Sequence, residues 1–252
     1  MSRLALPALL HELRRTSWVA CIYGVLLCQP GLAAEGREPG DTSELHPATG
    51  TDVAELPRLL IIGDSISGGY TPPLRVLLQG EVNVHRIPAN GGSTAKGVSQ
   101  IEKWLGNEPW DIIHFNWGLH DIKGGRCQPA KYRKNLTRLV NRLEATGAKL
   151  IWASTTPVPP AKVTPTRRNK DVILINGVAA KIMEEHHIPV TDLYAVVLPR
   201  LKEMQQPANV HFTDAGSAFL AEQVATGIRD ALLAERLALP ETVNEPIPRE
   251  RR

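Results

Sequence analysis

Four short polar segments of the chain contain residue types that can carry out acyl transfer. They are Gly63-Asp64-Ser65, Asn90-Gly91-Gly92-Ser93, Gly118-Leu119-His120-Asp121 and Asn209-Val210-His211. A serine hydroxyl is a poor nucleophile until a neighbouring base takes its proton. Histidine can accept and return that proton near neutral pH. The segments therefore offer Ser65 as a candidate nucleophile and His211 as a candidate base.

An isolated Gly-Asp-Ser is more often a turn or a helix cap than an active site. Here it follows an apolar run, and a histidine lies late in the chain, just before a helix pattern. Residues 63–69 lack the lysine and spacing of a phosphate-binding loop. Ser67 occupies the last glycine position of an α/β-hydrolase nucleophile elbow, and Ser65 follows the first strand instead of several. No His/Cys/Asp cluster has metal-ligand spacing, so neither a metal nor a cofactor is expected.

The elements that must position these residues alternate between strand and helix patterns. Strands are predicted over 58–63, 82–88, 110–118, 148–157 and 188–194, and helices over 72–80, 97–106, 130–147, 170–187 and 214–237. This alternation predicts an α/β fold, a three-layer α/β/α sandwich with a central parallel sheet. Working residues gather at the carboxyl ends of such strands. The first three polar segments are therefore expected on one edge, which a loop entering the last helix can also reach.

The four segments, in this order, resemble the SGNH (or GDSL) hydrolase superfamily over about residues 57–233. The resemblance implies a flavodoxin-like SGNH hydrolase fold with Ser65 as nucleophile and His211 as base. It also implies an oxyanion hole made by the backbone N–H of Ser65, the second-segment glycine and a side chain of the third segment. That glycine is Gly92, with Gly91 as the near alternative.

The third and fourth segments depart from the family pattern. The family has Gly-x-Asn-Asp where this chain has His120, whose ring N–H could take over the role of the Asn amide or simply fill the site. The family has Asp three residues before its histidine, and that position is Ala208. Either a Ser–His dyad operates, with His211 held by a backbone carbonyl or Asn209, or Asp192 or Asp214 supplies the acid. The dyad is favoured.

Other residues are expected to support the site. Asp64, Asn90 and Asn209 flank the reacting groups, and Asp121 is expected to brace the loop that carries Ser65. Thr213 is a good N-cap for the last helix and would fix where His211 points. Four cations in the loop 159–171 could meet an anionic substrate, although a solvated loop is favoured: Lys162, Arg167, Arg168 and Lys170.

The first 33 residues have the order of a secretory signal. Arg14 and Arg15 precede an apolar run over 18–28, and a small-residue exit follows at Gly31-Leu32-Ala33. The run is shorter than the roughly 20 residues that span a bilayer, so no stable membrane anchor is expected after cleavage. A linker over 34–55, a hydrolase domain over 56–236 and a disordered tail over 237–252 follow. Cleavage would leave Cys127 as the only thiol, without an internal disulfide.

Together these features predict a secreted or periplasmic serine esterase that removes short acyl groups, such as acetyl, from a carbohydrate. Its partner would be a small-molecule or polysaccharide ester. The net charge of +3 is too weak to indicate nucleic-acid binding. A lipid esterase or thioesterase of the same fold is the alternative within the class. From another class, the missing acid could mark a non-catalytic glycan-binding domain.

Overall fold

The computed structural model describes residues 52–238. The predicted signal segment, most of the predicted linker and the tail from residue 239 lie outside the described residues, so those domain boundaries stay predictions. A parallel five-stranded sheet with the order β2-β1-β3-β4-β5 forms the centre. Its strands are β1 (Arg58–Ile62), β2 (Asn83–Arg86), β3 (Ile112–Phe115), β4 (Lys149–Ala153) and β5 (Val190–Thr191).

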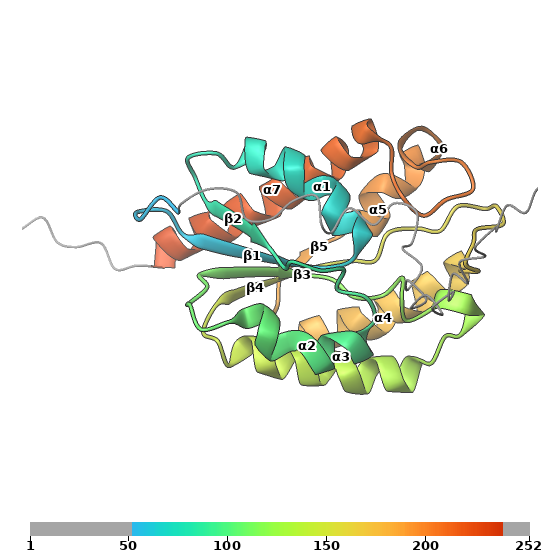
Figure 1. Ribbon diagram of the computed structural model, residues 1–252, viewed down its shortest axis with the longest axis horizontal. Helices are drawn as coiled ribbons and strands as arrows, with labels where there is room; N and C mark the ends of the chain where they lie inside the picture. Colours follow the sequence, from blue (N-terminus) through green and yellow to red (C-terminus); the bar gives the residue numbers. More distant parts are fainter. Residues whose placement is uncertain (1–51, 239–252) are drawn as a thin grey trace, which may run out of the picture. The chain divides into compact units, whose positions relative to one another are not determined.

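Helices cover both faces of this sheet, which confirms the predicted three-layer α/β/α sandwich (Figure 1). The helices are α1 (Ser65–Leu77), α2 (Thr94–Leu105), α3 (Pro129–Glu144), α4 (Asn169–Glu185), α5 (Leu193–Val197), α6 (Leu201–Met204) and α7 (Asp214–Ala238), with 3-10 turns η1 (Lys123–Gly125) and η2 (Leu198–Arg200). Alternate strand residues face opposite layers. Leu59 and Ile61 pack with α1, α5 and α7, whereas Leu60 and Ile62 pack with α2, α3 and α4.

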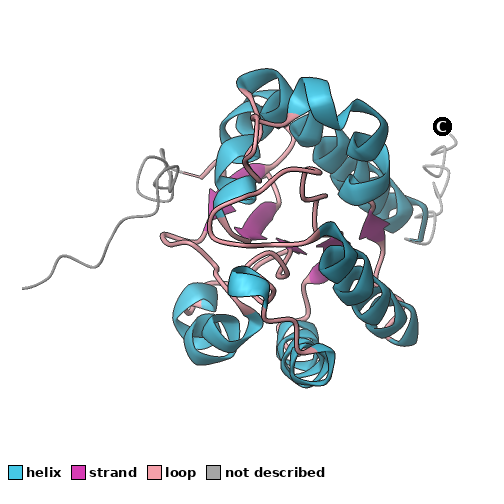
Figure 2. Cartoon of the chain, turned by 90° about the vertical axis from the view of Figure 1, so that its right-hand side faces the viewer, coloured by secondary structure: helices cyan, strands magenta, loops and turns pink. Residues whose placement is uncertain are grey.

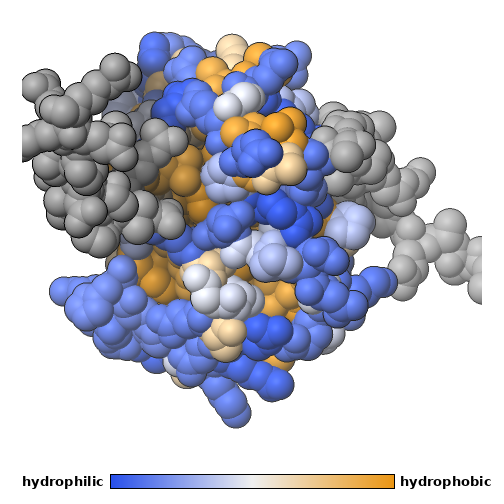
Figure 3. Space-filling model, turned by 90° about the vertical axis from the view of Figure 1, so that its left-hand side faces the viewer, coloured by the Kyte–Doolittle hydropathy of each residue, from blue (hydrophilic) through white to orange (hydrophobic). Residues whose placement is uncertain are grey.

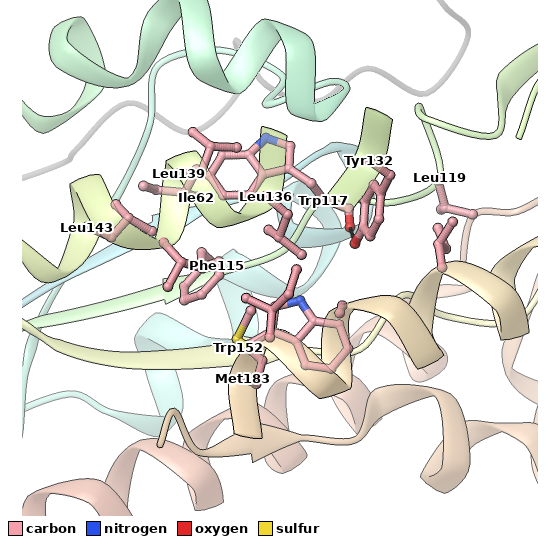
Figure 4. Close-up of a cluster of buried hydrophobic side chains, with 14 of the residues drawn as sticks. Ile62, Phe115, Trp117, Leu119, Tyr132, Leu136, Leu139, Leu143, Trp152 and Met183 are labelled. Atoms are coloured by element: carbon pink, nitrogen blue, oxygen red, sulfur yellow. Dashed lines mark hydrogen bonds between the residues drawn. The ribbon is translucent and has the colours of Figure 1, made fainter. Parts of the chain in front are cut away.

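The core beneath α2, α3 and α4 also fixes the loop that follows β3. Trp117 and Tyr132 are fully buried there, and the Tyr132 hydroxyl donates to the backbone oxygen of Trp117 at 2.8 Å (Figure 4). Phe115 and Trp152 lie deeper in the same cluster. Trp117, Tyr132 and the hydrogen bond from the Tyr132 hydroxyl to the Trp117 backbone oxygen thus anchor the start of the segment that carries His120 and Asp121.

Several elements differ from the sequence prediction: β3 and β4 are shorter than the strands predicted over 110–118 and 148–157, and two further differences involve helix caps. Helix α1 begins at Ser65 and not near residue 72, because the Asp64 side chain caps it by accepting the N–H of Ile66 at 3.0 Å. The predicted last strand is only two residues long, because Asp192 caps α5 by accepting the N–H of Ala195. Both misplaced boundaries have one cause: an aspartate directly after a strand starts a helix.

The strand order reverses direction beside β1, which has β2 on one side and β3 on the other. Such a switch point is where open α/β sheets hold their ligands, outside the carboxyl ends of the strands. Figure 2 looks onto this edge, where loops fill the space between the two helix layers. The opposite edge, seen in Figure 3, is mainly hydrophilic with separate apolar areas. No helix within the described range is long and apolar enough to cross a membrane.

Candidate active site

Ser65 and His211 meet at the carboxyl edge of the sheet although 146 residues separate them. The Ser65 Oγ atom lies 2.8 Å from His211 Nε2. Ser65 is the first residue of α1, and His211 lies just before α7. The Thr213 hydroxyl accepts the N–H of Gly216 at 3.0 Å and so caps α7, as predicted. Packing of α1 against α7 therefore brings the candidate nucleophile and base within hydrogen-bonding distance.

The turn that presents Ser65 is joined to the second polar segment by a backbone hydrogen bond. The N–H of Gly91 donates to the Gly63 oxygen at 2.9 Å. A Cβ atom on Gly91 would lie 2.7 Å from that oxygen, so only glycine permits the approach. This contact fixes the distance between the nucleophile turn and the loop that enters α2.

Arg86, at the end of β2, braces the same turn and was not singled out by the sequence. Its side chain is buried, and Nη2 donates to the backbone oxygens of Asp64 (2.9 Å) and Gly63 (3.3 Å). Nε donates to Ser67 Oγ, and Nη1 donates to the oxygens of Ile87 and Ala89. An arginine ending a strand in a run of apolar residues was the available signal, because a buried guanidinium requires several acceptors.

Asn209 orients the His211 ring. Its Oδ1 atom lies 2.8 Å from His211 Nδ1 and also accepts the backbone N–H of His211 at 3.1 Å. Since the same oxygen faces both nitrogens, Nδ1 must carry the proton and donate it. The Nε2 lone pair is therefore directed at Ser65 Oγ. An amide oxygen thus lies where a triad acid would contact the imidazole.

The two alternative acids have other positions. Asp192 Oδ1 accepts from Ser154 Oγ at 2.7 Å and caps α5, so its carboxylate is a structural group of that helix. Asp214 is the first residue of α7 and lines the cleft beside His211. Ala208, at the family's acid position, has a φ of 50°. Asn209, and none of these three residues, is the hydrogen-bond partner described for His211 Nδ1.

The predicted oxyanion glycines both have hydrogen-bond acceptors in this structure. Gly91 donates to a backbone oxygen, as described above. Gly92 has a φ of 62°, and its N–H donates to Asn90 Oδ1 at 2.9 Å. A side-chain amide can rotate away, whereas a backbone carbonyl within the fold cannot. Gly92 is therefore the better candidate donor of the two, and Asn90 holds its N–H when no substrate is bound.

Asp121 supports a different element from the expected one. Its carboxylate accepts the N–H of Thr94 (3.0 Å to Oδ2) and the Thr94 hydroxyl, so it holds the start of α2 and not the turn that carries Ser65. Burial raises the pKa of Asp121 to about 6, although the hydrogen bonds from Thr94 act in the opposite direction. The reason is topological: Asp121 follows β3 on the α2 side of the sheet.

The Ser65–His211 pair opens into a cleft of about 640 Å³. The cleft is lined by small, apolar and polar residues: Ser65, Ile66, Gly68, Gly69, Pro72, Pro73, Gln206, Asn209, His211, Phe212, Asp214, Ser217 and Ala218. His120 lies instead in the wall of a second cavity, with Ser93 and Asp121. The structure thus gathers Ser65, His211 and Asn209 in one cleft, and His120 in its neighbour.

Two cations of the loop 159–171 are engaged within the protein. Arg167 is buried and donates to the Leu119 oxygen at 2.9 Å, and Arg168 pairs with Asp171 at 2.7 Å. Arg167 thus braces the loop after β3 from the interior, whereas Arg168, Lys162 and Lys170 are exposed, which agrees with the favoured solvated loop. Cys127 lies in the same region, and burial raises the pKa of its thiol, as expected of an unreactive cysteine.

In the described range, no group of three or more His, Cys, Asp or Glu side chains could hold a metal ion. The other histidines of the sheet and α4 serve the fold. His85 pairs with Asp52, His186 pairs with Glu144, and His114 is fully buried.

A flavodoxin-like parallel sheet with a Ser–His pair at the switch point defines a carboxylic ester hydrolase of the serine type. Residues 61–219 match the profile of the GDSL-like Lipase/Acylhydrolase family. The chain belongs to this family. No curated protein matches the sequence.

Solved structures with the same fold include several ester hydrolases. The acetyl xylan esterase AlAXEase has a TM-score of 0.57 at 16% identity, over 68% of this chain and 99% of that one. A lipase/acylhydrolase from Enterococcus faecalis has a TM-score of 0.61 at 22% identity, over 69% and 96%. TesA has a TM-score of 0.58 at 20% identity, over 69% and 99%. At these identities the likeness establishes the fold.

Proposed function

We propose that this protein is a secreted serine esterase that hydrolyses short acyl esters, acetyl above all, on a carbohydrate. The observation that carries the proposal is the 2.8 Å contact between Ser65 Oγ and His211 Nε2, with Asn209 Oδ1 on the other ring nitrogen. That geometry prepares the hydroxyl for deprotonation, because the unprotonated ring nitrogen faces it.

The reaction follows from these contacts. Nε2 of His211 removes the proton of Ser65 Oγ as the oxygen attacks the ester carbonyl carbon. The imidazolium then returns the proton to the leaving alcohol, which leaves an acyl-serine. Water, deprotonated by the same nitrogen, attacks the carbonyl carbon of the acyl-serine. The imidazolium then returns its proton to Ser65 Oγ as the acyl–oxygen bond breaks, which releases the carboxylic acid and restores the pair.

The developing oxyanion needs donors. The N–H of Ser65 stands at the first position of α1, where helix geometry provides no intrahelical acceptor. Gly92 contributes its N–H once the Asn90 side chain releases it, and the ring N–H of His120 is the third donor that the family resemblance implies. Asp64 keeps the first donor in place by capping α1.

Asn209 gives the pair a neutral third member. It orients the imidazole and selects its tautomer, as a triad acid does, but it adds no counter-charge to the imidazolium. The Ser–His dyad of this proposal is therefore a pair oriented by an amide. The consequence is weaker stabilisation of the charged ring that forms during the reaction than a carboxylate would give.

The cleft supports a small acyl group. Its apolar lining consists of Ile66, Pro72 and Pro73 from α1 and Phe212 from the His211 loop, which can hold a short acyl group. Polar side chains such as Gln206 complete the lining, which suits a hydroxyl-rich alcohol better than a long hydrocarbon chain. The similarity in fold to an acetyl xylan esterase and the signal-like first 33 residues support the carbohydrate and the secretion.

Replacement of Ser65 tests the proposal. Ser65→Ala should lower the hydrolysis of p-nitrophenyl acetate by at least about 10³-fold and abolish labelling by a fluorophosphonate, since it removes the nucleophile. Ser99→Ala removes an exposed hydroxyl of α2 and serves as the matched control. Both variants should keep the thermal midpoint. Retention of most activity in Ser65→Ala, or no labelling of the wild type, would refute the assignment and leave a glycan-binding domain.

A graded series of substrates tests the acyl and alcohol parts. Rates should fall from p-nitrophenyl acetate to the decanoate, and acetate should be released from an acetylated polysaccharide. A maximum at the long-chain esters would make the protein a lipid esterase or thioesterase.

A further inference from the structure

The second cavity differs from the Ser65–His211 cleft in its charge. It has a volume of about 500 Å³ and lies at the same edge of the sheet, between the loop after β3 and the first turns of α2 and α3. Its lining includes three cationic side chains, Lys123, Arg126 and Lys131. The first cleft has no lysine or arginine in its lining and one carboxylate, Asp214.

Two cations of the second cavity, Lys123 and Arg126, lie on a braced loop, and Lys131 lies on the first turn of α3. Arg167 donates to the Leu119 oxygen, and the N–H of Gly125 donates to the Thr166 oxygen at 3.1 Å. Arg168 Nη2 donates to the Gly125 oxygen at 3.3 Å. Arg167 and Arg168 thus donate hydrogen bonds to the segment that carries Lys123 and Arg126, and these bonds fix its position. A braced loop presents charge with less loss of conformational entropy on binding.

The charges of the cavity are available to a ligand. Within residues 52–238, Arg126 and Lys131 have no carboxylate partner, and both are exposed. The one carboxylate of the lining, Asp121, already accepts two hydrogen bonds from Thr94. Ser93, Gln128 and Asn135 add neutral groups that can hydrogen-bond to hydroxyls.

The cavity is linked to the Ser65 turn through the second polar segment. Ser93 follows Gly92, the candidate oxyanion donor, and the N–H of Gly91 is bonded to the turn that carries Ser65. His120 and Asp121 belong to the segment directly after β3, the strand that pairs with β1. A substrate whose ester lies at Ser65 can therefore extend past the second segment into this cavity.

We propose that the second cavity is a subsite for a carboxylate-bearing sugar unit next to the acylated one, bound through Arg126 and Lys131. The inference rests on the proposed function, since it names the kind of glycan that carries the ester: an acidic, uronate-type glycan. Guanidinium and ammonium groups bind a carboxylate, and the neutral polar groups suit ring hydroxyls. Most of the side chains that line this cavity are polar or charged.

Matched substrates test the subsite. O-acetylated galacturonate oligomers are compared with the same oligomers after their carboxylates are converted to carboxamides, and the release of acetate is measured. The wild type should have a kcat/KM about tenfold or more higher for the acidic oligomers at low salt. The ratio should fall towards one in 0.5 M NaCl, because salt screens exposed charges. Equal rates for the two substrates at low salt would overturn the proposal.

Paired variants locate the effect. In the double variant Arg126→Gln/Lys131→Gln the preference for the acidic oligomers should fall to less than twofold. The control Lys103→Gln/Lys181→Gln removes the same charge from exposed sites on α2 and α4 and should keep the preference. An equal loss of the preference in both double variants would show that only the net charge of the protein matters. An unchanged preference in Arg126→Gln/Lys131→Gln would show that the carboxylate binds at another site. Either outcome would overturn the subsite.

A binding measurement separates the subsite from the proposed function. If p-nitrophenyl acetate is cleaved but the acidic oligomers are not preferred, the esterase stands and the subsite fails. If no ester is cleaved, titration calorimetry with deacetylated galacturonate oligomers decides. Binding that is lost in Arg126→Gln/Lys131→Gln would keep the subsite without the esterase, and no binding to the wild type would remove it.

Discussion

The two halves of the proposed catalytic pair, Ser65 and His211, are held in different ways. The turn with Ser65 is buried, and the guanidinium of Arg86 binds two of its backbone oxygens. The loop with His211 is held by neutral amides: Gln205 donates to the oxygens of Pro157 and Val210, and Asn209 accepts from His211. The candidate nucleophile is thus fixed by a buried charge with several acceptors, and the candidate base by neutral hydrogen bonds, of which those of Gln205 are buried and that of Asn209 is part-buried.

This difference predicts where the molecule is sensitive. A change on the Ser65 side removes hydrogen-bond partners from buried polar groups and should lower the free energy of unfolding. A change on the base side alters the orientation and the proton affinity of one ring and should cost rate while leaving stability almost intact. The following variants test that division.

Loss of Arg86 should have the largest effect on stability. In Arg86→Met the buried oxygens of Gly63 and Asp64 lose their charged donor and keep only their neutral ones, so the free energy of unfolding should fall by about 3 kcal/mol. Arg75→Met is the control, because Arg75 Nε makes a single bond to the Val84 oxygen, and its loss should cost about 1 kcal/mol. Urea denaturation measures both. Equal costs in the two variants would contradict the special role of Arg86.

His114, against the nucleophile helix, should control stability in acid. Burial lowers its pKa to about 4, and its ring packs edge-on against Tyr70 of α1. The unfolded chain binds a proton below about pH 6.5 and the folded chain only near pH 4, so stability is present above pH 6.5 and lost as the pH falls. His114→Phe should remove about 3 kcal/mol of that loss between pH 6.5 and 4. An unchanged acid limb of the stability curve would show that His114 is not its source.

On the base side, Asn209→Ala should lower kcat by about tenfold to a hundredfold while the thermal midpoint stays within about 2 °C. The variant frees the His211 ring to rotate. Asn209→Asp would place a carboxylate on Nδ1, which should raise the pKa of His211 and move the acid limb of the rate profile to higher pH. Ala208→Asp would place a carboxylate at the family's acid position instead. Asn209→Asp is the sharper test, because Asn209 already contacts Nδ1 of the ring. An identical pH profile in Asn209→Asp would show that residue 209 does not act on the ring.

The smallest effects should come from the two carboxylates that could have been triad acids. Asp192→Asn and Asp214→Asn should each keep kcat/KM within tenfold of the wild type, since Asp192 caps α5 and Asp214 begins α7. Circular dichroism checks that each variant is folded. A loss of several orders of magnitude in either one would reveal a charged third member and contradict the neutral base side.

Local chemistry made most of the fold visible in the sequence. The apolar run of β1, the Gly147 stop beyond α3 and the Thr213 cap of α7 are short-range signals, because strand alternation and helix capping depend on neighbours in the chain. The start of helix α1 was predicted wrongly. The Asp64 cap lies close to the end of β1, and the two prolines inside the helix indicated a start near residue 72. The order of the polar segments likewise pointed to Ser65 and His211.

Only the tertiary structure decided which groups support the reaction. Which residue faces His211 Nδ1 depends on the backbone path over 208–211, where Ala208 has a positive φ and Asn209 turns back to the ring. The role of Arg86 depends on β2 lying beside β1. The structural role of Arg167 depends on its contact with the Leu119 oxygen, 48 residues away in the chain. The sequence by itself pointed to the proposed reacting pair and determined most of the elements that carry it, because those signals are local. The groups that orient the pair come from segments far apart in the chain, so their contacts exist only once the sheet and its two helix layers have packed.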